Sequence, residues 1–478
     1  MAFARSAGVA LAAVGMSATA LVAGAAQLGD ATGAPGAGDR YFPRYGNGGY
    51  DVRHYDIFVD YNPTTERLHG DTRLTARAEQ RLTRFHLDLQ IPAKAVRVNG
   101  EPATWRQHGR ELVISPAAAL RKGKAFRVRV RYAGKPGEIN SGGLGGWFET
   151  SDGAVLAGEP EAATLWFPSN DHPSDKASFD IDVRTARGTD VVSNGRLTGR
   201  RPIGDEVVWR WRMSSPMATY LAYVAFGDFS FERGRTAGGV PYLYAISDHL
   251  GKRRASAVKS LRKSADIVDM FSRHFGPYPF DITGGTLANV NFGFALENQT
   301  RPIYSKVFFG GKAANINVIA HELAHQWFGD DVSVQQWRYI WLNEGFATWC
   351  AWFYEAHRAG PSTDEFFTDA YRGFRKVRSF WRLEIGNPGK QRLFDFAVYL
   401  RGAMALEAVR NVVGNNDFFR TMRSWVRSRG DGDGSIAGFQ RLAERISERP
   451  LDHVFDVWLH STARPRPTKA NGFPASML

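Results

Sequence analysis

The chain has 478 residues, of which 43% are hydrophobic and 23% are charged, and its formal net charge is +13. This composition excludes a fibrous or disordered protein, and the length exceeds what one hydrophobic core usually holds, so we expect two domains. The basic residues are scattered through alternating patterns, without a basic run interleaved with aromatic residues. We therefore expect a solvated basic surface and no nucleic-acid partner.

Residues 1–29 hold a single charge, Arg5, followed by an uncharged stretch of Ala, Gly and Val that ends in small residues. This arrangement is typical of a secretory signal peptide, and the small residues up to Ala25 favour cleavage there. We therefore expect a secreted, extracellular protein without stable membrane insertion. The alternative is an uncleaved membrane anchor, because the stretch is long enough to span a bilayer.

Two sections of different pattern follow. Residues 30–50 are rich in Gly, Pro and Asp, which predicts a linker. Residues 51–235 alternate apolar and polar side chains in short runs separated by turn signals, which predicts an N-terminal β domain. The runs expected to form strands are Tyr55–Tyr61, Leu82–Leu89, Ala95–Val98, Phe126–Tyr132, Phe179–Arg184 and Val207–Met213.

The hydrophobic period changes in the second half of the chain. Apolar residues between Lys252 and Phe275 recur at helical spacing, and helical patterns continue to about His460. Residues 236–463 are therefore expected to form a mainly helical domain. Residues 464–478 contain four Pro or Gly residues and few apolar side chains, which predicts a flexible tail. The predicted fold class is α+β.

An apolar helical run at residues 317–329 contains the motif His321-Glu322-Leu-Ala-His325. Residues four apart return to nearly the same face of a helix, so both imidazoles can point at one metal ion. The motif alone also fits a histidine that is hydrogen-bonded in the core. A third ligand separates the two interpretations, because a catalytic zinc takes three protein ligands and keeps an open position.

Glu344 supplies that third ligand in a second apolar helical run, residues 341–347, nineteen residues after His325. The connecting loop is long enough to turn the chain back, so the two helices can bring two imidazoles and a carboxylate together. Two His and one Glu, with a further Glu inside the His pair, is the pattern of hydrolytic zinc sites. The sequence thus predicts one Zn²⁺ per chain, held by His321, His325 and Glu344.

These two motifs resemble those of the M1 family of zinc aminopeptidases, which are gluzincins with thermolysin-like catalytic domains. Two further segments strengthen the resemblance: Met217–Phe229 is similar to the last strand of the family's N-terminal domain, and Tyr399-Leu-Arg-Gly402 is similar to its Tyr-x-Lys-Gly motif. The resemblance runs from about Tyr55 to Thr462. It implies an N-terminal β domain, a thermolysin-like catalytic domain and removal of N-terminal residues from peptides with a free N-terminus.

The resemblance also implies roles for two catalytic residues. Glu322 is expected to be the general base that takes a proton from the attacking water and passes it to the leaving amine. Tyr399 is expected to stabilise the charge that develops on the scissile carbonyl oxygen. Without the resemblance, Tyr399 reads as an aromatic residue near the start of an amphipathic helix.

Substrate-binding residues come from two segments. Phe294-Ala295-Leu-Glu297-Asn298 is similar to the family's Gly-Ala-Met-Glu-Asn segment, so Ala295 and Asn298 are expected beside the substrate, and Glu297 is expected to bind its α-ammonium. Phe294 and Leu296 depart from the family pattern, which leaves the adjoining subsites open. The segment Pro168–Pro173 resembles a family motif downstream of a second amine-binding residue, which places that role at Glu159 or, with a shifted alignment, at Glu161.

Two other departures bear on mechanism. Ala351 stands where many relatives have a carboxylate, so the zinc ligands must be oriented by other groups. By the resemblance we also expect this chain to be a short form without the long helical domain of larger relatives, and hence to have a more open cleft. A thermolysin-like endopeptidase and a catalytically inert binding module are the alternatives. The preferred N-terminal residue and the oligomeric state stay open.

Overall fold

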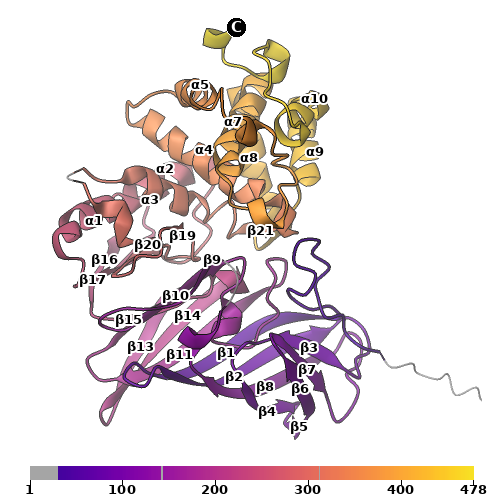
Figure 1. Cartoon of the computed structure of the whole chain (residues 1–478), viewed down its shortest axis with the longest axis vertical. Helices are drawn as coiled ribbons and strands as arrows, with labels where there is room; N and C mark the ends of the chain where they lie inside the picture. Colours follow the sequence, from indigo (N-terminus) through magenta and orange to yellow (C-terminus); the bar gives the residue numbers. More distant parts are fainter. Residues whose placement is uncertain (1–30, 141–143, 312) are drawn as a thin grey trace, which may run out of the picture.

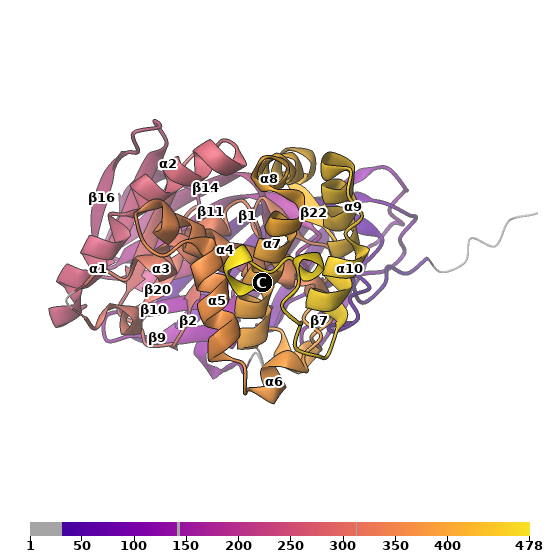
Figure 2. The same ribbon diagram turned by 90° about the horizontal axis from the view of Figure 1, so that it is seen from above.

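The computed structural model describes residues 31–140, 144–311 and 313–478, so the expected signal peptide lies outside the described residues. Figure 1 shows a strand-rich layer below and a helical layer above, in chain order from indigo to yellow. The view from above in Figure 2 shows the helices lying over the sheets. The predicted α+β fold, a β-rich domain followed by a mainly helical one, is confirmed.

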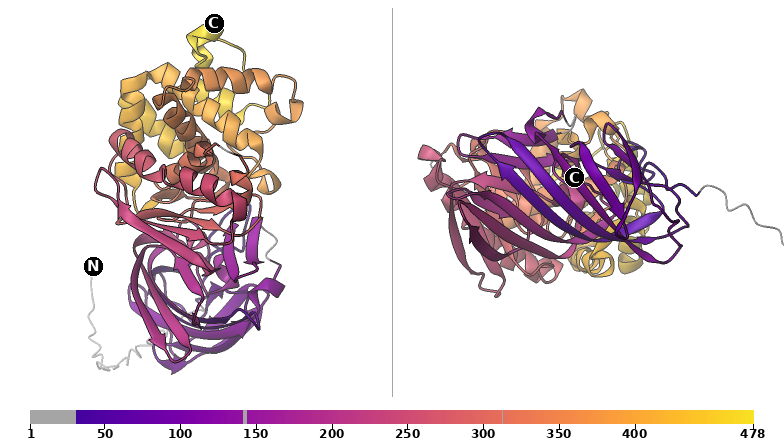
Figure 3. Two further views of the ribbon diagram at one scale, coloured as in Figure 1. Left: turned by 90° about the vertical axis from the view of Figure 1, so that its left-hand side faces the viewer. Right: turned by 90° about the horizontal axis from the view of Figure 1, so that it is seen from below.

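A curved eight-stranded sheet forms the base of the molecule, seen from below in Figure 3. In β1 the residues Tyr55, Ile57 and Val59 are fully buried while their neighbours are partly exposed, as alternation along a strand requires. β1 pairs antiparallel with β2 and parallel with β11. In spatial order the strands are β13 (Arg196–Ile203), β14 (Glu206–Ala218), β11 (Lys176–Ala186), β1 (Tyr50–Asn62), β2 (Arg67–Ala78), β8 (Ala125–Gly134), β4 (Ala93–Val98) and β5 (Glu101–Pro102).

Two smaller sheets complete the first domain. Every strand run expected from the sequence lies within or around an observed strand, but Met217–Phe229 is not one strand: it spans the end of β14, a short 3-10 turn and β15. The three-stranded sheet has the order β3 (Phe85–Asp88), β7 (Glu111–Ser115), β6 (Thr104–His108); the four-stranded sheet has the order β12 (Asp190–Ser193), β15 (Val224–Gly227), β10 (Ala154–Glu159), β9 (Leu144–Glu149).

A five-stranded sheet, which the sequence did not indicate, lies between the base and the helices. Its first strand ends at Arg235, so the domain boundary expected at residues 235 and 236 falls inside the β16–β17 hairpin. β19 is an edge strand, with one side free of strand partners among the described residues. The order is β16 (Phe229–Arg235), β17 (Pro241–Ser247), β18 (Thr283–Ala288), β20 (Ile303–Ser305), β19 (Ala295–Leu296).

The helical layer is organised around α4, which packs against α3 on one side and α7 on the other. Trp327, Trp341 and Trp349 are fully buried there. Across the described residues, the chain forms no helix with the length and apolarity that a membrane crossing needs. The helices are α1 (Arg254–Leu261), α2 (Ser264–Phe275), α3 (Ile316–Ala324), α4 (Trp341–His357), α5 (Thr363–Gly373), α6 (Arg378–Trp381), α7 (Phe396–Val413), α8 (Asn415–Arg429), α9 (Ile436–Ser447) and α10 (Asp452–Phe455), and β21 (Val332–Val334) pairs with β22 (Gly432–Gly434).

The two segments expected to be a linker and a flexible tail are both packed against the rest of the protein. In the segment expected to be a linker, the buried carboxylate of Asp39 accepts a hydrogen bond of 2.7 Å from the backbone N–H of Trp337 in the second domain. In the segment expected to be a flexible tail, the buried ring of Phe473 packs against Phe367 and Trp458. Both segments have few apolar residues, but those few insert between elements that are distant in sequence.

Candidate metal centre and active site

α3 carries the first two candidate metal ligands on one side and a buried apolar surface on the other. Its N-terminus is capped by Asn315, whose side chain accepts a hydrogen bond from the Val318 N–H. Ile319 and Leu323 are fully buried and fix the rotation of the helix. That rotation turns His321 toward α4, and the next turn ends the helix at its C-cap residue, His325.

His321, His325 and Glu344 converge on one point. The Nε2 atom of His321 lies 3.2 Å from Nε2 of His325 and 3.1 Å from Oε2 of Glu344, and His325 Nε2 lies 3.6 Å from the same oxygen. Donors around a tetrahedral ion with bonds of about 2.1 Å are separated by about 3.4 Å. The three donor atoms therefore fit a zinc ion in both type and spacing.

The opposite ring nitrogens face groups that can orient the imidazoles. His325 Nδ1 lies 3.2 Å from the backbone carbonyl oxygen of Phe328, and His321 Nδ1 lies 3.5 Å from the hydroxyl of Thr348. Thr348 follows Glu344 by one turn of α4. These two contacts occupy the outer positions that usually fix the tautomer of a metal-binding histidine. Ala351 is buried and apolar, so it offers no polar group to orient the ligands.

Four carboxylates surround this point with little solvent to screen them. Burial raises the pKa of Glu322 well above its usual range, and the charges of Glu297 and Glu344 raise it further. Burial also raises the pKa of Glu159, and the charge of Glu297 raises it further. For Glu344, by contrast, the nearby imidazoles outweigh burial and lower the pKa to about 2. Keeping several such buried carboxylates in their charged form therefore requires a bound cation nearby.

A cavity of about 570 Å³ opens beside the three donors. Eight of the nine predicted site residues line it: Glu159, Ala295, Glu297, His321, Glu322, His325, Glu344 and Tyr399. They come from β10, β19 and the loop after it, α3, α4 and α7. The exception is Asn298, which is fully buried behind the cavity and donates its side-chain amide to the Leu221 carbonyl at 2.8 Å.

The two acidic residues weighed for the second amine-binding position differ in their surroundings. Glu159 ends β10 and faces the cavity, and one of its carboxylate oxygens is buried without a hydrogen-bond partner. Glu161 instead pairs with Arg110 and accepts a hydrogen bond of 2.9 Å from Tyr45. Only Glu159 thus keeps an acceptor free for a ligand in the cavity.

Tyr399 lies in the first turn of α7, where its ring stacks on that of His321 with centroids 5.9 Å apart. Its enclosed position and the nearby Glu344 and Glu159 raise the pKa of the phenol, so it keeps its proton at neutral pH. Arg401 anchors the same turn by donating hydrogen bonds to the carbonyl oxygens of Trp381 and Leu383 at 2.9 and 2.8 Å.

Sequence reasoning missed several residues of this site. The Tyr220 hydroxyl donates to Glu297 at 3.3 Å, and Gln326 donates to the backbone carbonyl of the same residue at 2.9 Å. Phe394 and Phe396 line the cavity, and 75% of Phe396 is exposed. Gln326, a polar residue directly after His325 in an otherwise apolar run, and Phe396, an aromatic residue three positions before Tyr399, were visible signals in the sequence. Tyr220 is placed only by tertiary contact.

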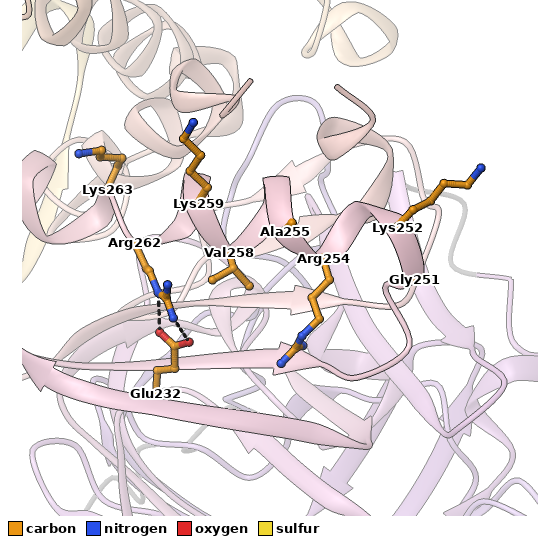
Figure 4. Close-up of a pocket in the computed structure, with 9 residues that line it drawn as sticks. All are labelled: Glu232, Gly251, Lys252, Arg254, Ala255, Val258, Lys259, Arg262 and Lys263. Carbon is orange, nitrogen blue, oxygen red and sulfur yellow. Dashed lines mark hydrogen bonds and ion pairs between the residues drawn. The ribbon is translucent and has the colours of Figure 1, made fainter. Parts of the chain in front are cut away.

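A second hollow beside α1, shown in Figure 4, has a different chemistry. Its charged side chains are mostly basic, and Glu232 is the one carboxylate among its lining residues. Arg262 pairs with Glu232 through two hydrogen bonds of 3.0 and 2.7 Å. This lining offers no imidazole, so it is not a rival metal centre.

Two family models match most of the chain. Residues 261–458 match the family model described as "Peptidase family M1 domain", and residues 52–221 match "Peptidase M1 N-terminal domain". A probable aminopeptidase 1 of Sulfurisphaera tokodaii is 26% identical over 446 residues, which cover 87% of this chain and 53% of the relative. Endoplasmic reticulum aminopeptidase 1 of Homo sapiens is 28% identical over 407 residues, which cover 76% of this chain and 42% of the relative. The chain thus spans about half the length of these curated relatives.

Among solved structures, an M1 zinc metallopeptidase from Deinococcus radiodurans, bound as a mutant to a Tyr-Ser-Ala substrate, superposes with a TM-score of 0.82 at 27% identity. The match covers 91% of this chain and 99% of that one. A solved chain that is matched over nearly its whole length is therefore similar in fold as well as in sequence.

Proposed function

Because the chain belongs to peptidase family M1, we propose that it is a zinc-dependent aminopeptidase that releases N-terminal residues from peptides with a free N-terminus. The observation that carries the proposal is one cavity that combines the His321, His325 and Glu344 donors with Glu159 and Glu297. The donors suit a hydrolytic metal, and the two further carboxylates suit a substrate ammonium group.

The metal half of the proposal rests on donor type and spacing. His321, His325 and Glu344 would hold one zinc ion per chain, since two imidazole nitrogens and one carboxylate oxygen lie 3.1 to 3.6 Å apart. When bound, zinc would acidify a water molecule and polarise the scissile carbonyl group. The Phe328 carbonyl and Thr348 hydroxyl would hold the two rings in place.

Glu322 is the proposed general base. It follows His321 directly, and its carboxylate lies within 4.8 Å of a ring nitrogen of His325. Burial and neighbouring carboxylates raise its pKa, so it gains proton affinity without being one of the three close donors. A group poised in this way takes a proton from the attacking water and gives it to the leaving amine.

Tyr399 is proposed to donate a hydrogen bond to the carbonyl oxygen as charge develops there. The phenol keeps its proton because its pKa is raised, and the stacking on His321 holds the ring beside the reacting bond. A donor fixed before the reaction begins stabilises the transition state more than the ground state.

Glu297 and Glu159 are proposed to bind the α-ammonium group. Tyr220 and Gln326 hold Glu297 in place, and an oxygen of Glu159 lacks a partner. An internal peptide bond brings no cation to these carboxylates, so their desolvation is uncompensated and endopeptidase action is disfavoured. The backbone of Ala295, on edge strand β19, can pair with an extended peptide.

The substrate test compares aminoacyl chromogenic amides with their N-acetylated forms on zinc-loaded enzyme. We expect cleavage of the free-amine forms only, and its loss after chelation. In Glu297→Gln the kcat/KM for free amines should fall about a hundredfold, since a charge-assisted hydrogen bond is lost. Exposed Glu101→Gln is the charge-matched control and should behave as wild type.

Two outcomes would replace the proposal. Equal cleavage of acetylated substrates or internal bonds would make the protein an endopeptidase. Zinc binding without turnover of any peptide amide would make it an inert binding module.

We also propose that the chain is exported, from the uncharged apolar stretch within residues 1–29. N-terminal sequencing of the protein recovered outside producing cells would test this proposal. A mature protein beginning near residue 26 agrees with it, and retention of the intact N-terminus inside the cell contradicts it.

A further inference from the structure

A second cluster of metal-binding side chains lies away from the cavity. Asp152 lies in the turn between β9 and β10, Asp228 lies between β15 and β16, and His249 follows β17. One potential donor atom from each residue lies within 4.8 Å of the others. None of the three lines the candidate active site.

The donors already have a defined arrangement. His249 Nε2 lies 2.8 Å from Oδ2 of Asp228 and 4.0 Å from Oδ2 of Asp152. Around a six-coordinate ion with bonds of about 2.1 Å, adjacent donors are about 3.0 Å apart and opposite donors about 4.2 Å apart. The two distances match that pattern better than the single spacing of a tetrahedral site.

Asp152 is held rigidly, whereas the other two donors are open to solvent. Only 8% of the Asp152 side chain is exposed; it accepts hydrogen bonds from the Thr150 hydroxyl at 2.9 Å and the Asp228 N–H at 3.0 Å. The side chains of Asp228 and His249 are 49% and 44% exposed. An ion therefore has a fixed anchor on one side, and an entry path and room for water ligands on the other.

The charge around the cluster also favours a bound cation. Asp248 lies next to His249, and Asp190 accepts a hydrogen bond of 3.1 Å from the Phe229 N–H, one residue after Asp228. Arg200 and Arg254 are the described arginines that pair with these two outer carboxylates, at 4.0 and 3.4 Å. Negative charge thus collects here on a chain whose net charge is +13.

We propose that Asp152, Asp228 and His249 form a second metal site that takes a six-coordinate divalent transition-metal ion, with water completing the shell. Two carboxylate oxygens and one imidazole nitrogen suit such ions, and the nitrogen selects them over calcium and magnesium. The bound ion joins the β9–β10 turn of the four-stranded sheet, the β15–β16 link between the two sheets and the loop after β17 of the five-stranded sheet. It stabilises that junction and takes no part in peptide hydrolysis.

Manganese is the probe, added to enzyme whose catalytic site is already loaded with zinc. Electron paramagnetic resonance of free Mn²⁺ gives the bound fraction directly, and it does so whether or not the enzyme cleaves peptides. We expect one Mn²⁺ per zinc-loaded chain, retained in millimolar Mg²⁺ or Ca²⁺. Asp228→Asn and His249→Gln should each weaken binding by at least about a hundredfold, because each removes one of three protein ligands.

Asp248→Asn is the matched control, since it removes a neighbouring carboxylate that is not a proposed ligand. It should leave the Mn²⁺ affinity within a few-fold of wild type. Mn²⁺ should also raise the Tm of zinc-loaded wild type and of Asp248→Asn but not of Asp228→Asn. A cooperative unfolding transition in each variant shows that the variant is folded.

The proposal is overturned if zinc-loaded wild type binds no Mn²⁺, if Asp228→Asn binds it as well as wild type does, or if Mg²⁺ displaces it at equal concentration.

Discussion

The two clusters of histidine and carboxylate groups use the same donor types but differ in burial and in origin. The first is enclosed, and its residues come from two helices that lie close in sequence. Two of the three side chains in the second cluster are about half exposed, and the cluster comes from three turns spread over about a hundred residues. Water screens the charge of the exposed carboxylates, whereas the charge of the buried ones must be compensated by neighbouring groups, by protonation or by a bound cation. Removing a charge should therefore change activity or stability more in the buried cluster than in the exposed one.

The largest expected effect is at Glu322. Glu322→Gln keeps the shape of the side chain but removes the proposed base, so kcat should fall about a thousandfold. Zinc content measured after dialysis should stay at wild-type level. Asp228→Asn, the same kind of change in the exposed cluster, should leave kcat within twofold. A similar loss of kcat in both variants would show that burial does not separate the two clusters.

Tyr399 should show the next largest effect. Tyr399→Phe removes only the hydroxyl, and loss of one donor to a developing oxyanion lowers kcat by about a hundredfold to a thousandfold. KM should change little, because the hydrogen bond forms mainly in the transition state. Steady-state kinetics on one aminoacyl amide separates the two constants. A rise in KM with kcat unchanged would assign Tyr399 to ground-state binding.

Lys176 extends the comparison to a partly buried cation. Its ammonium group donates hydrogen bonds to the backbone carbonyls of Asp330 and Asp331 at 2.6 and 2.8 Å, and burial lowers its pKa to about 8. Between this value and the ordinary pKa of 10.5, the unfolded chain binds a proton that the folded chain has released. Folding stability should therefore rise with pH across this window, by up to about 3 kcal/mol.

The measurement is the difference in unfolding free energy between wild type and Lys176→Met at pH 7.5 and at pH 10.5. Wild type should gain stability relative to the variant as the pH rises. A difference that is constant with pH would mean that the lysine keeps its ordinary pKa in the folded protein.

The buried cluster could be predicted from the sequence because its information is local. Helical periodicity aligns His321 with His325, which are four residues apart, and a loop that turns the chain back brings in Glu344 from the next helix along the chain. The alternating strands of the first domain were predictable for the same reason. Glu159 and Glu297 needed the family resemblance, because no local pattern brings β10 to the loop after β19.

The features that sequence reasoning missed depend on contacts between distant residues. β18 reads Thr-Gly-Gly-Thr-Leu-Ala and β19 has two residues, so neither shows alternation, although both strands are paired in the sheet. Asp39 and Phe473 lie in Pro- and Gly-rich segments and are buried only because distant elements close around them. The cluster of Asp152, Asp228 and His249 is of this kind as well, since three separate turns must meet to form it.

The smallest effect is expected when the exposed cluster is changed without its metal. The 2.8 Å pair of His249 and Asp228 is a solvent-exposed ion pair, and such pairs contribute little to folding stability. In the presence of chelator and excess salt, Asp228→Asn should therefore unfold at nearly the same denaturant concentration as wild type. With Mn²⁺ at a hundredfold excess over its Kd, wild type alone should gain about 2.7 kcal/mol. A large loss of stability in Asp228→Asn without metal would instead show that the His249–Asp228 pair itself stabilises the fold. Exposure would then not explain why the two clusters respond differently to the loss of a charge.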